Sequence, residues 1–143
     1  MSAIANEGHY ITPHLNKCDS MLKKIHYCKV DKKYFPVVFE GMWRVFESGT
    51  ARASKIPGID MCGKTGTADN SHGKPHSVFV GFAPRVHPKI AIAVIVENAG
   101  GGATFAAPIF SLLVEQYLRG KITRVEKEEE ISNIVTNSYV QER

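Results

Sequence analysis

The residues best suited to chemistry lie in one short stretch, Gly63-Lys64-Thr65-Gly66-Thr67. Five consecutive positions hold a cationic side chain, two hydroxyls and two glycines, a residue type that lets a ligand approach the backbone closely. Two incompatible interpretations fit this stretch, and they predict different functions.

The first interpretation is a phosphate-binding loop, because residues 58–65 match the pattern GxxxxGK[ST] in full. Backbone amides would then cradle phosphates, and Lys64 would contact the terminal ones. Such a loop must follow a buried strand and open a helix whose N-terminus helps to bind the anion. Residues 52–57 form no apolar strand, and the glycines and proline between positions 66 and 75 stop a helix. The flanks disfavour this interpretation, and a nucleotide-binding loop at Gly58 to Thr65 is kept as the alternative.

The second interpretation is the KTG motif of β-lactamases and penicillin-binding proteins, which stands on a strand beside a nucleophilic serine. Strand alternation sends Lys64 and Gly66 to one face and Thr65 and Thr67 to the other. A twist, or an edge position of the strand, must therefore bring the hydroxyls or the adjacent backbone toward a ligand.

Other candidate sites have simpler explanations. The three cysteines form no CxxC pair and the six histidines are dispersed, so we expect no metal and no cofactor. Two SxxK strings, at residues 20–23 and 71–74, lie in polar turns, where Ser20 and Ser71 are typical turn residues. Core packing accounts for Trp43 and Phe46. Capping or solvation accounts for two further carboxylates, Asp60 and Glu97.

Size and composition indicate one globular domain. The chain has 143 residues, 43% of them hydrophobic and 22% charged, which is too apolar for native disorder. The net charge of +4 comes from scattered lysines and arginines, so no nucleic-acid partner is expected. The longest apolar run, Ile90 to Val96, is too short to cross a membrane, and we expect the chain itself to be soluble.

The first third of the chain predicts small elements followed by one clear helix. Residues 1–8 are typical of the last turns of a helix that ends at a glycine, which indicates a domain cut from a longer chain. Short strands are expected within residues 9–15 and 23–30. Apolar residues recur at helical spacing from Tyr34 to Glu47, which predicts an amphipathic helix.

The rest of the chain predicts a sheet covered by a helix. Strands are expected at 59–67, 77–83 and 89–97, with a connection at 69–75. Residues 90–96 are apolar on both faces and therefore predict a central strand. A helix with proline near its start is expected at 108–119. The fold class is α+β, an antiparallel sheet with packed helices.

The order of these motifs resembles the end of the transpeptidase domain of class B penicillin-binding proteins, most of all the elongation type, penicillin-binding protein 2. The resemblance covers most of residues 4–118. The matching stretches are Ala5-Asn6-Glu7-Gly8, Ile11-Thr12-Pro13-His14, Gly63-Lys64-Thr65-Gly66-Thr67-Ala68, Phe79-Val80-Gly81-Phe82-Ala83-Pro84, Ile90-Ala91-Ile92-Ala93-Val94, Glu97-Asn98 and Ala106-Ala107-Pro108.

The resemblance implies a partial domain related to β-lactamases and a peptidoglycan D,D-transpeptidase that works through a serine acyl-enzyme. Lys64 and Thr67 would be catalytic, and Lys64, Thr65, Gly66 and Thr67 would bind the stem peptide or a β-lactam. The amide of Thr67 would help to stabilise the oxyanion. No cofactor is implied.

The resemblance also implies what this sequence lacks. The 143 residues contain no SxN triplet, and the family's nucleophile would lie upstream of them. We therefore expect residues 1–120 to be the C-terminal part of the domain, inactive alone, and residues 121–143 to be a polar, partly disordered tail. The parent would face the periplasm from the inner membrane, held by an N-terminal helix absent here, and would act with other cell-wall elongation proteins.

Overall fold

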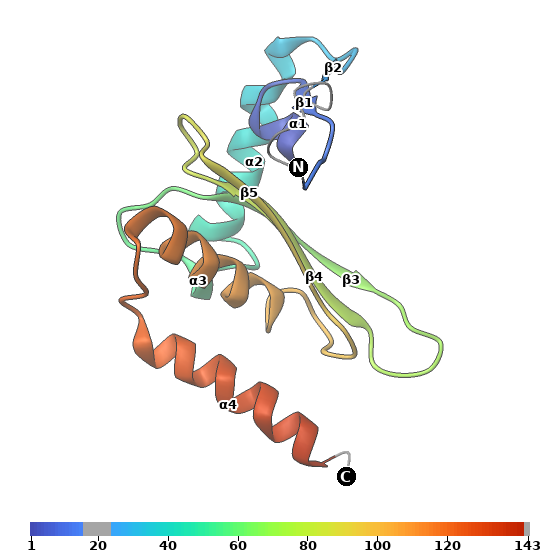
Figure 1. The fold of residues 1–143 in the computed structure, drawn as a ribbon, viewed down its shortest axis with the longest axis vertical. Helices are drawn as coiled ribbons and strands as arrows, with labels where there is room; N and C mark the ends of the chain where they lie inside the picture. Colours follow the sequence, from blue (N-terminus) through green and yellow to red (C-terminus); the bar gives the residue numbers. More distant parts are fainter. Residues whose placement is uncertain (16–23, 142–143) are drawn as a thin grey trace.

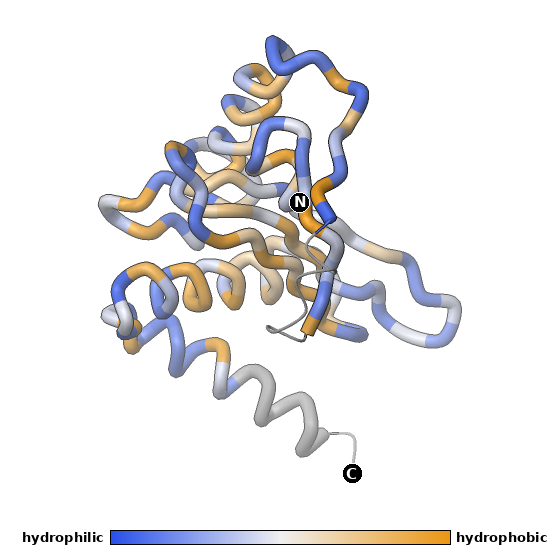
Figure 2. Tube along the Cα trace, turned by 45° about the horizontal axis from the view of Figure 1, so that its top comes forward, coloured by the Kyte–Doolittle hydropathy of each residue, from blue (hydrophilic) through white to orange (hydrophobic). Residues whose placement is uncertain are grey.

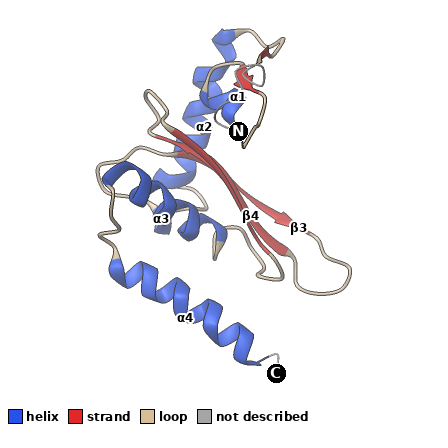
Figure 3. Ribbon diagram, viewed as in Figure 1, coloured by secondary structure: helices blue, strands red, loops and turns tan. Residues whose placement is uncertain are grey.

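The computed structural model describes residues 1–15 and 24–141 (Figure 1). The elements along the chain are α1 (Ser2–Ala5), β1 (His9–Ile11), β2 (Ile25–Tyr27), η2 (Lys32–Tyr34), α2 (Phe35–Glu47), η3 (Arg52–Ser54), β3 (Cys62–Ala68), β4 (His76–Ala83), β5 (Ile90–Val96), α3 (Ala106–Arg119) and α4 (Val125–Gln141). Helices packed on antiparallel strands confirm the expected α+β class (Figure 3). No helix in the described part of the chain has the length and apolar character needed to cross a membrane.

Three consecutive strands form the main sheet, in the order β3-β4-β5, with both pairs antiparallel. Gly66 pairs with Val78, and Val78 pairs in turn with Ile95. Short connections join strands that are neighbours in the chain, so meander pairing needs no crossover. The predicted strands and the connection at 69–75 are confirmed.

Helix α3 covers one face of this sheet (Figure 1). Phe79 of β4 and Phe110 of α3 are fully buried, with ring centroids 4.8 Å apart. Phe46 of α2 joins them, at 5.5 Å from Phe79 and 6.0 Å from Phe110. Apolar segments of the sheet and α3 face each other in the hydropathy colouring (Figure 2). This aromatic cluster is the centre of the core.

Helices α1 and α2 cover only one end of the opposite face. A second buried cluster joins Ala5, Met42, Cys62 and Phe82 where β3 begins. Helix α1 ends before Gly8, whose φ of 106° lies in the region that favours glycine, as the sequence predicted. Strands β1 and β2 pair as a separate small antiparallel sheet, with His9 opposite Tyr27.

Strand β5 corrects one prediction. The apolar run of residues 90–96 was expected to be a central strand, but within residues 1–15 and 24–141 β5 pairs only with β4 and lies at an edge. Ala91, Ala93 and Ile95 are exposed, with Ile95 at 67%. Only the face toward α3 is covered, because no described element packs on the other face along this strand.

The end of the chain corrects a second expectation. Helix α4 occupies Val125–Gln141, where the sequence predicted a polar tail with no face to bury. Ile131 of this helix is buried. The turn before α4 is fixed by Glu115, which is fully buried and accepts hydrogen bonds from Arg119 and Arg124 at 2.9 and 2.8 Å. A buried carboxylate recruits both guanidinium groups and so orders the chain after α3.

Candidate active site

The predicted motif stands on β3, and the start of that strand is anchored in the core. Cys62 and Gly63 are buried, whereas Lys64 and Thr67 are exposed. A Cβ atom at Gly63 would lie 2.5 Å from a ring carbon of Phe79, so only glycine fits there. The motif therefore begins at a fixed point and continues onto the surface.

The sequence predicts that Lys64 and Thr65 leave opposite faces of the strand, and the edge position of β3 lets the two residues meet despite this. In the described part of the chain β3 pairs only with β4, so its outer edge is open in the sense that no strand pairs with it. The Nζ atom of Lys64 donates to the carbonyl oxygen of Thr65 at 2.8 Å. The ammonium thus bends back to the backbone of the next residue instead of extending away from the strand. The Lys64 ammonium and the backbone of Thr65 therefore meet, although the two side chains leave opposite faces of the strand.

The hydroxyl of Thr65 has a partner that the sequence did not predict. Its Oγ1 lies 3.1 Å from Oγ1 of Thr50, in the loop that follows α2. Thr50 is fifteen residues away and belongs to no motif, so no sequence signal pointed to it. Only the packing of α2 beside β3 brings the two hydroxyls together.

A second unpredicted feature supports the strand from the side of α3. A Cβ atom at Gly102 would lie 2.5 Å from the carbonyl oxygen of Gly66 and closer still to that of Val78. Ser77, opposite Thr67, holds this turn in place: its hydroxyl donates to the Gly101 carbonyl at 2.9 Å and accepts from the amide of Ala106 at 3.1 Å. The glycine run at 100–102 was the available signal, because close backbone contact requires glycine.

A pocket of about 310 Å³ adjoins the motif on the side of α2. Its lining comes from one face of that helix, the following loop and β3: Gly41, Arg44, Val45, Ser48, Gly49, Thr50 and Lys64. Arg44 is already paired with Glu40 at 2.8 Å, so the ammonium of Lys64 and the two hydroxyls are the lining groups that suit an anionic or strongly polar group.

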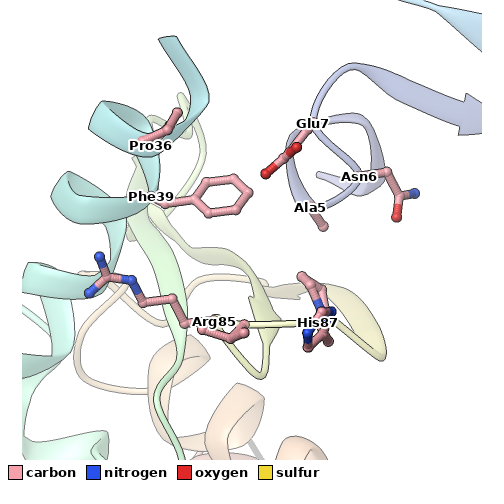
Figure 4. A pocket seen from close by; sticks show the side chains of 9 residues that line it. Ala5, Asn6, Glu7, Pro36, Phe39, Arg85 and His87 are labelled. Atoms are coloured by element: carbon pink, nitrogen blue, oxygen red, sulfur yellow. The ribbon is translucent and has the colours of Figure 1, made fainter. Parts of the chain in front are cut away.

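Another pocket, of about 530 Å³, lies between α1, the start of α2 and the turn between β4 and β5 (Figure 4). Glu7, Phe39 and His87 are among its lining residues. Arg85, also at this pocket, is held by Glu40 at 2.9 Å and stacks over the Trp43 ring at 4.8 Å. None of the motif residues lines it, so we place the candidate site at the 310 Å³ pocket.

The simpler explanations of the other candidates agree with the geometry where it describes them. Ser71 is an exposed turn residue between β3 and β4, and the string at 20–23 lies outside the described residues. Phe46 belongs to the core, and the indole nitrogen of Trp43 donates to Asp60 at 3.3 Å. Asp60 and Glu97 lie at opposite ends of the sheet, so they cannot act as a pair.

Cys62 is not a nucleophile, although it stands two residues before Lys64. Burial raises the pKa of its thiol to about 12, so it is protonated at neutral pH. Its sulfur atom lies 3.5 Å from the carbonyl oxygen of Phe39, inside the second buried cluster.

The phosphate-loop alternative finds no support in the fold. Its lysine and threonine would have to open a helix, but Lys64 and Thr65 are the third and fourth residues of β3. The chain then turns and returns as β4. A strand in this place cannot supply the helix N-terminus that such a loop uses to bind phosphate.

Comparison with known proteins gives one consistent result. The sequence model of the family described as Penicillin binding protein transpeptidase domain matches residues 1–115. The peptidoglycan D,D-transpeptidase MrdA of Acinetobacter baumannii is 34% identical over 134 residues, covering 74% of this chain and 20% of that protein. The chain thus spans about a fifth of the length of this relative.

Solved structures show the same likeness. Penicillin-binding protein 2 of Pseudomonas aeruginosa, in complex with WCK 5153, superposes with a TM-score of 0.70 and 34% identity over 86% of this chain and 29% of that one. Penicillin-binding protein A of Mycobacterium tuberculosis, as its imipenem acyl-enzyme complex, gives a TM-score of 0.70 and 29% identity over 82% of this chain and 28% of that one.

Proposed function

Because this chain belongs to the penicillin-binding protein transpeptidase family, we propose that it forms one wall of the active site of a peptidoglycan D,D-transpeptidase. One observation carries the proposal: Gly63 to Thr67 stand on an open edge strand, with the Lys64 ammonium and the Thr65 hydroxyl at that edge. A ligand could therefore lie along β3 without displacing any described strand.

Each motif residue has a role that its position permits. The Lys64 ammonium supplies positive potential for the ligand carboxylate and assists proton movement, and the hydroxyls of Thr65 and Thr67 bind that carboxylate. Gly66 leaves the backbone free to lie against the ligand. The Thr67 amide donates to the oxyanion, a contribution of roughly 3 kcal/mol in comparable acyl-transfer sites.

The serine nucleophile would come from another part of a longer protein. Lys64 shares its face of the sheet with Val80 and Ala93, the residues opposite it in the neighbouring strands. This face is open along β5, where Ala93 and Ile95 are exposed. The remainder of the domain would pack here and bring the serine beside Lys64. Residues 1–143 alone would then be inactive, because no acyl-enzyme can form without that serine.

The same proposal gives the longer protein's substrates, inhibitors and location. Its substrates would be peptidoglycan stem peptides, and β-lactams would acylate it, as imipenem acylates penicillin-binding protein A of Mycobacterium tuberculosis. It would act at the periplasmic face of the inner membrane with other elongation proteins, anchored by an N-terminal helix outside this sequence.

The test is acylation of the full-length protein by a fluorescent penicillin. We expect labelling of the full-length protein, no labelling of residues 1–143 alone, and competition by unlabelled penicillin. Lys64→Ala should lower the acylation rate constant at least about a hundredfold, the size of effect seen when one stabilising group is removed from such a site.

Ser71→Ala is the matched control, because Ser71 lies in an exposed turn of an SxxK string and should be dispensable. An unlabelled full-length protein, or a drug adduct on Ser71 of the isolated chain, would contradict the proposal. Peptide mass mapping of the isolated chain would show whether an adduct is present on Ser71.

A further inference from the structure

We propose that Thr50 is a positioning residue that orients the Thr65 hydroxyl toward the carboxylate of the ligand. The inference rests on the proposed function, and it adds a residue that lies outside the motif. The observation behind it is the 3.1 Å separation of the Thr50 and Thr65 Oγ1 atoms.

The backbone around Thr50 is fixed on both sides. Gly49 precedes it with its amide bonded to the Arg44 carbonyl at 2.9 Å, and a Cβ atom at Gly49 would lie 2.8 Å from the Cα atom of Val45. Ala51 follows, 1% exposed, with its amide bonded to the Val45 carbonyl at 3.0 Å. The end of α2 therefore holds Thr50 against β3, so its contact with Thr65 is set by buried packing.

The direction of the hydrogen bond decides what Thr65 can do. Each hydroxyl has one proton to donate and two lone pairs to accept with. If Thr65 donates to Thr50, its proton is not available to a ligand. If Thr50 donates, the Thr65 proton is free, and a bound carboxylate favours this order because it accepts from Thr65. The resulting chain, Thr50 to Thr65 to carboxylate, strengthens both hydrogen bonds.

The adjoining pocket gives a second reason to place an anion here. Thr50 lines the 310 Å³ pocket together with Lys64 and Arg44, while its hydroxyl contacts that of Thr65. Thr50 thus belongs both to the pocket that Lys64 lines and to the hydrogen bond with Thr65. A regular strand by itself separates the side chains of Lys64 and Thr65.

The test compares two ligands on one preparation of the full-length protein. The first ligand is a penicillin with its free carboxylate, and the second is the methyl ester of the same penicillin. The ratio of their second-order acylation rate constants does not depend on the folded fraction, so a partly misfolded variant still gives a valid answer. We expect Thr50→Val to lower this ratio about tenfold, because a tenfold change corresponds to the loss of one hydrogen bond to a charged group.

Two variants serve as controls. Thr50→Ser keeps the hydroxyl and should restore the ratio to within about twofold, because only the methyl group is lost. Ser71→Ala removes a hydroxyl from an exposed turn outside this pocket and should leave the ratio unchanged.

An unchanged ratio in Thr50→Val, with normal acylation of the unaltered protein, would overturn the positioning role and leave the proposed function intact. A ratio lowered equally in Thr50→Ser would also overturn it, because the hydroxyl would then not be the cause. Failure of the unaltered protein to react with penicillin would overturn both proposals.

Discussion

The two faces of the three-stranded sheet differ sharply. On one face α3 buries Phe79, Val94 and Phe110 in a continuous apolar core. On the other face the second cluster covers only the end near Cys62 and Phe82, and Ala91, Ala93 and Ile95 remain exposed. The covered face holds the chain together. The open face carries Lys64. The proposed active-site wall therefore lies on the face that the described residues leave largely uncovered.

The two faces also place different constraints on β3. From the covered face, Gly102 and Phe79 fix the backbone at Gly66 and Gly63. At the open edge, the Lys64 ammonium donates to the Thr65 carbonyl oxygen, and the Thr65 hydroxyl contacts that of Thr50. The backbone of the motif is therefore set by packing, and the side chains of Lys64 and Thr67 are left exposed.

The largest effect should come from removing the central aromatic of the covered face. Phe110→Ala should lower the free energy of unfolding of the chain by about 4 kcal/mol, because it leaves a cavity beside Phe46 and Phe79. Ile95→Ala, on the open face, should change it by less than about 0.5 kcal/mol. Urea denaturation measures both, and equal losses would show that the faces are equally covered.

The second-largest effect should come from removing the charge of Glu115, a buried residue of α3. Glu115→Gln leaves Arg119 and Arg124 without their charged partner and should cost about 3 kcal/mol of stability. Burial alone would raise the pKa of Glu115, but the hydrogen bond from Thr123 and the Arg124 guanidinium outweigh it and lower the pKa to about 2.

This lowered pKa predicts a pH dependence with a definite sign. The stabilisation by Glu115 is fully present above the ordinary value of 4.5 and is lost as the pH falls through about 2. Unfolding free energies measured by denaturant between these pH values should fall more steeply for the unaltered chain than for Glu115→Gln. Parallel curves would mean that Glu115 titrates normally.

A smaller effect is expected at the glycine turn on the covered face. Gly102→Ala places a Cβ atom against the carbonyl oxygens of Val78 and Gly66 and should cost about 2 kcal/mol. Gly101→Ala is the matched control, because the nearest atom to its Cβ would be Thr104 Oγ1 at 3.9 Å. In the full-length protein Gly102→Ala should also slow acylation, since it displaces β3 at Gly66. Equal stability of the two variants would remove Gly102 as a support.

The smallest effect on stability concerns the open face itself. Ile95→Ser should leave the unfolding free energy of the isolated chain nearly unchanged but reduce its self-association, because an exposed edge strand with apolar residues invites pairing between copies. Analytical ultracentrifugation over a concentration series would show this. Thr104→Ser, at another exposed position, should leave self-association as it is.

Much of the fold could be predicted because local patterns determine it. The spacing of Phe39, Met42 and Phe46 predicted α2, and the alternation with turn residues predicted β3, β4 and their connection. The prediction failed at β5, because an apolar run does not say which of its faces is covered. It also failed at α4, because neither the buried ion pairs of Glu115 nor the burial of Ile131 leaves a local sequence pattern.

For the candidate site, the sequence by itself determined which groups are candidates: a lysine, two threonines and a glycine in fixed order on a strand. Short-range chemistry is sufficient for that, since the motif is continuous in the chain. Only the tertiary structure decided where those groups can act. It placed β3 at an open edge, brought Thr50 to Thr65 and pressed Gly102 against Gly66. These contacts join residues 15 and 36 positions apart, and such proximity comes from packing between elements, which no local pattern encodes.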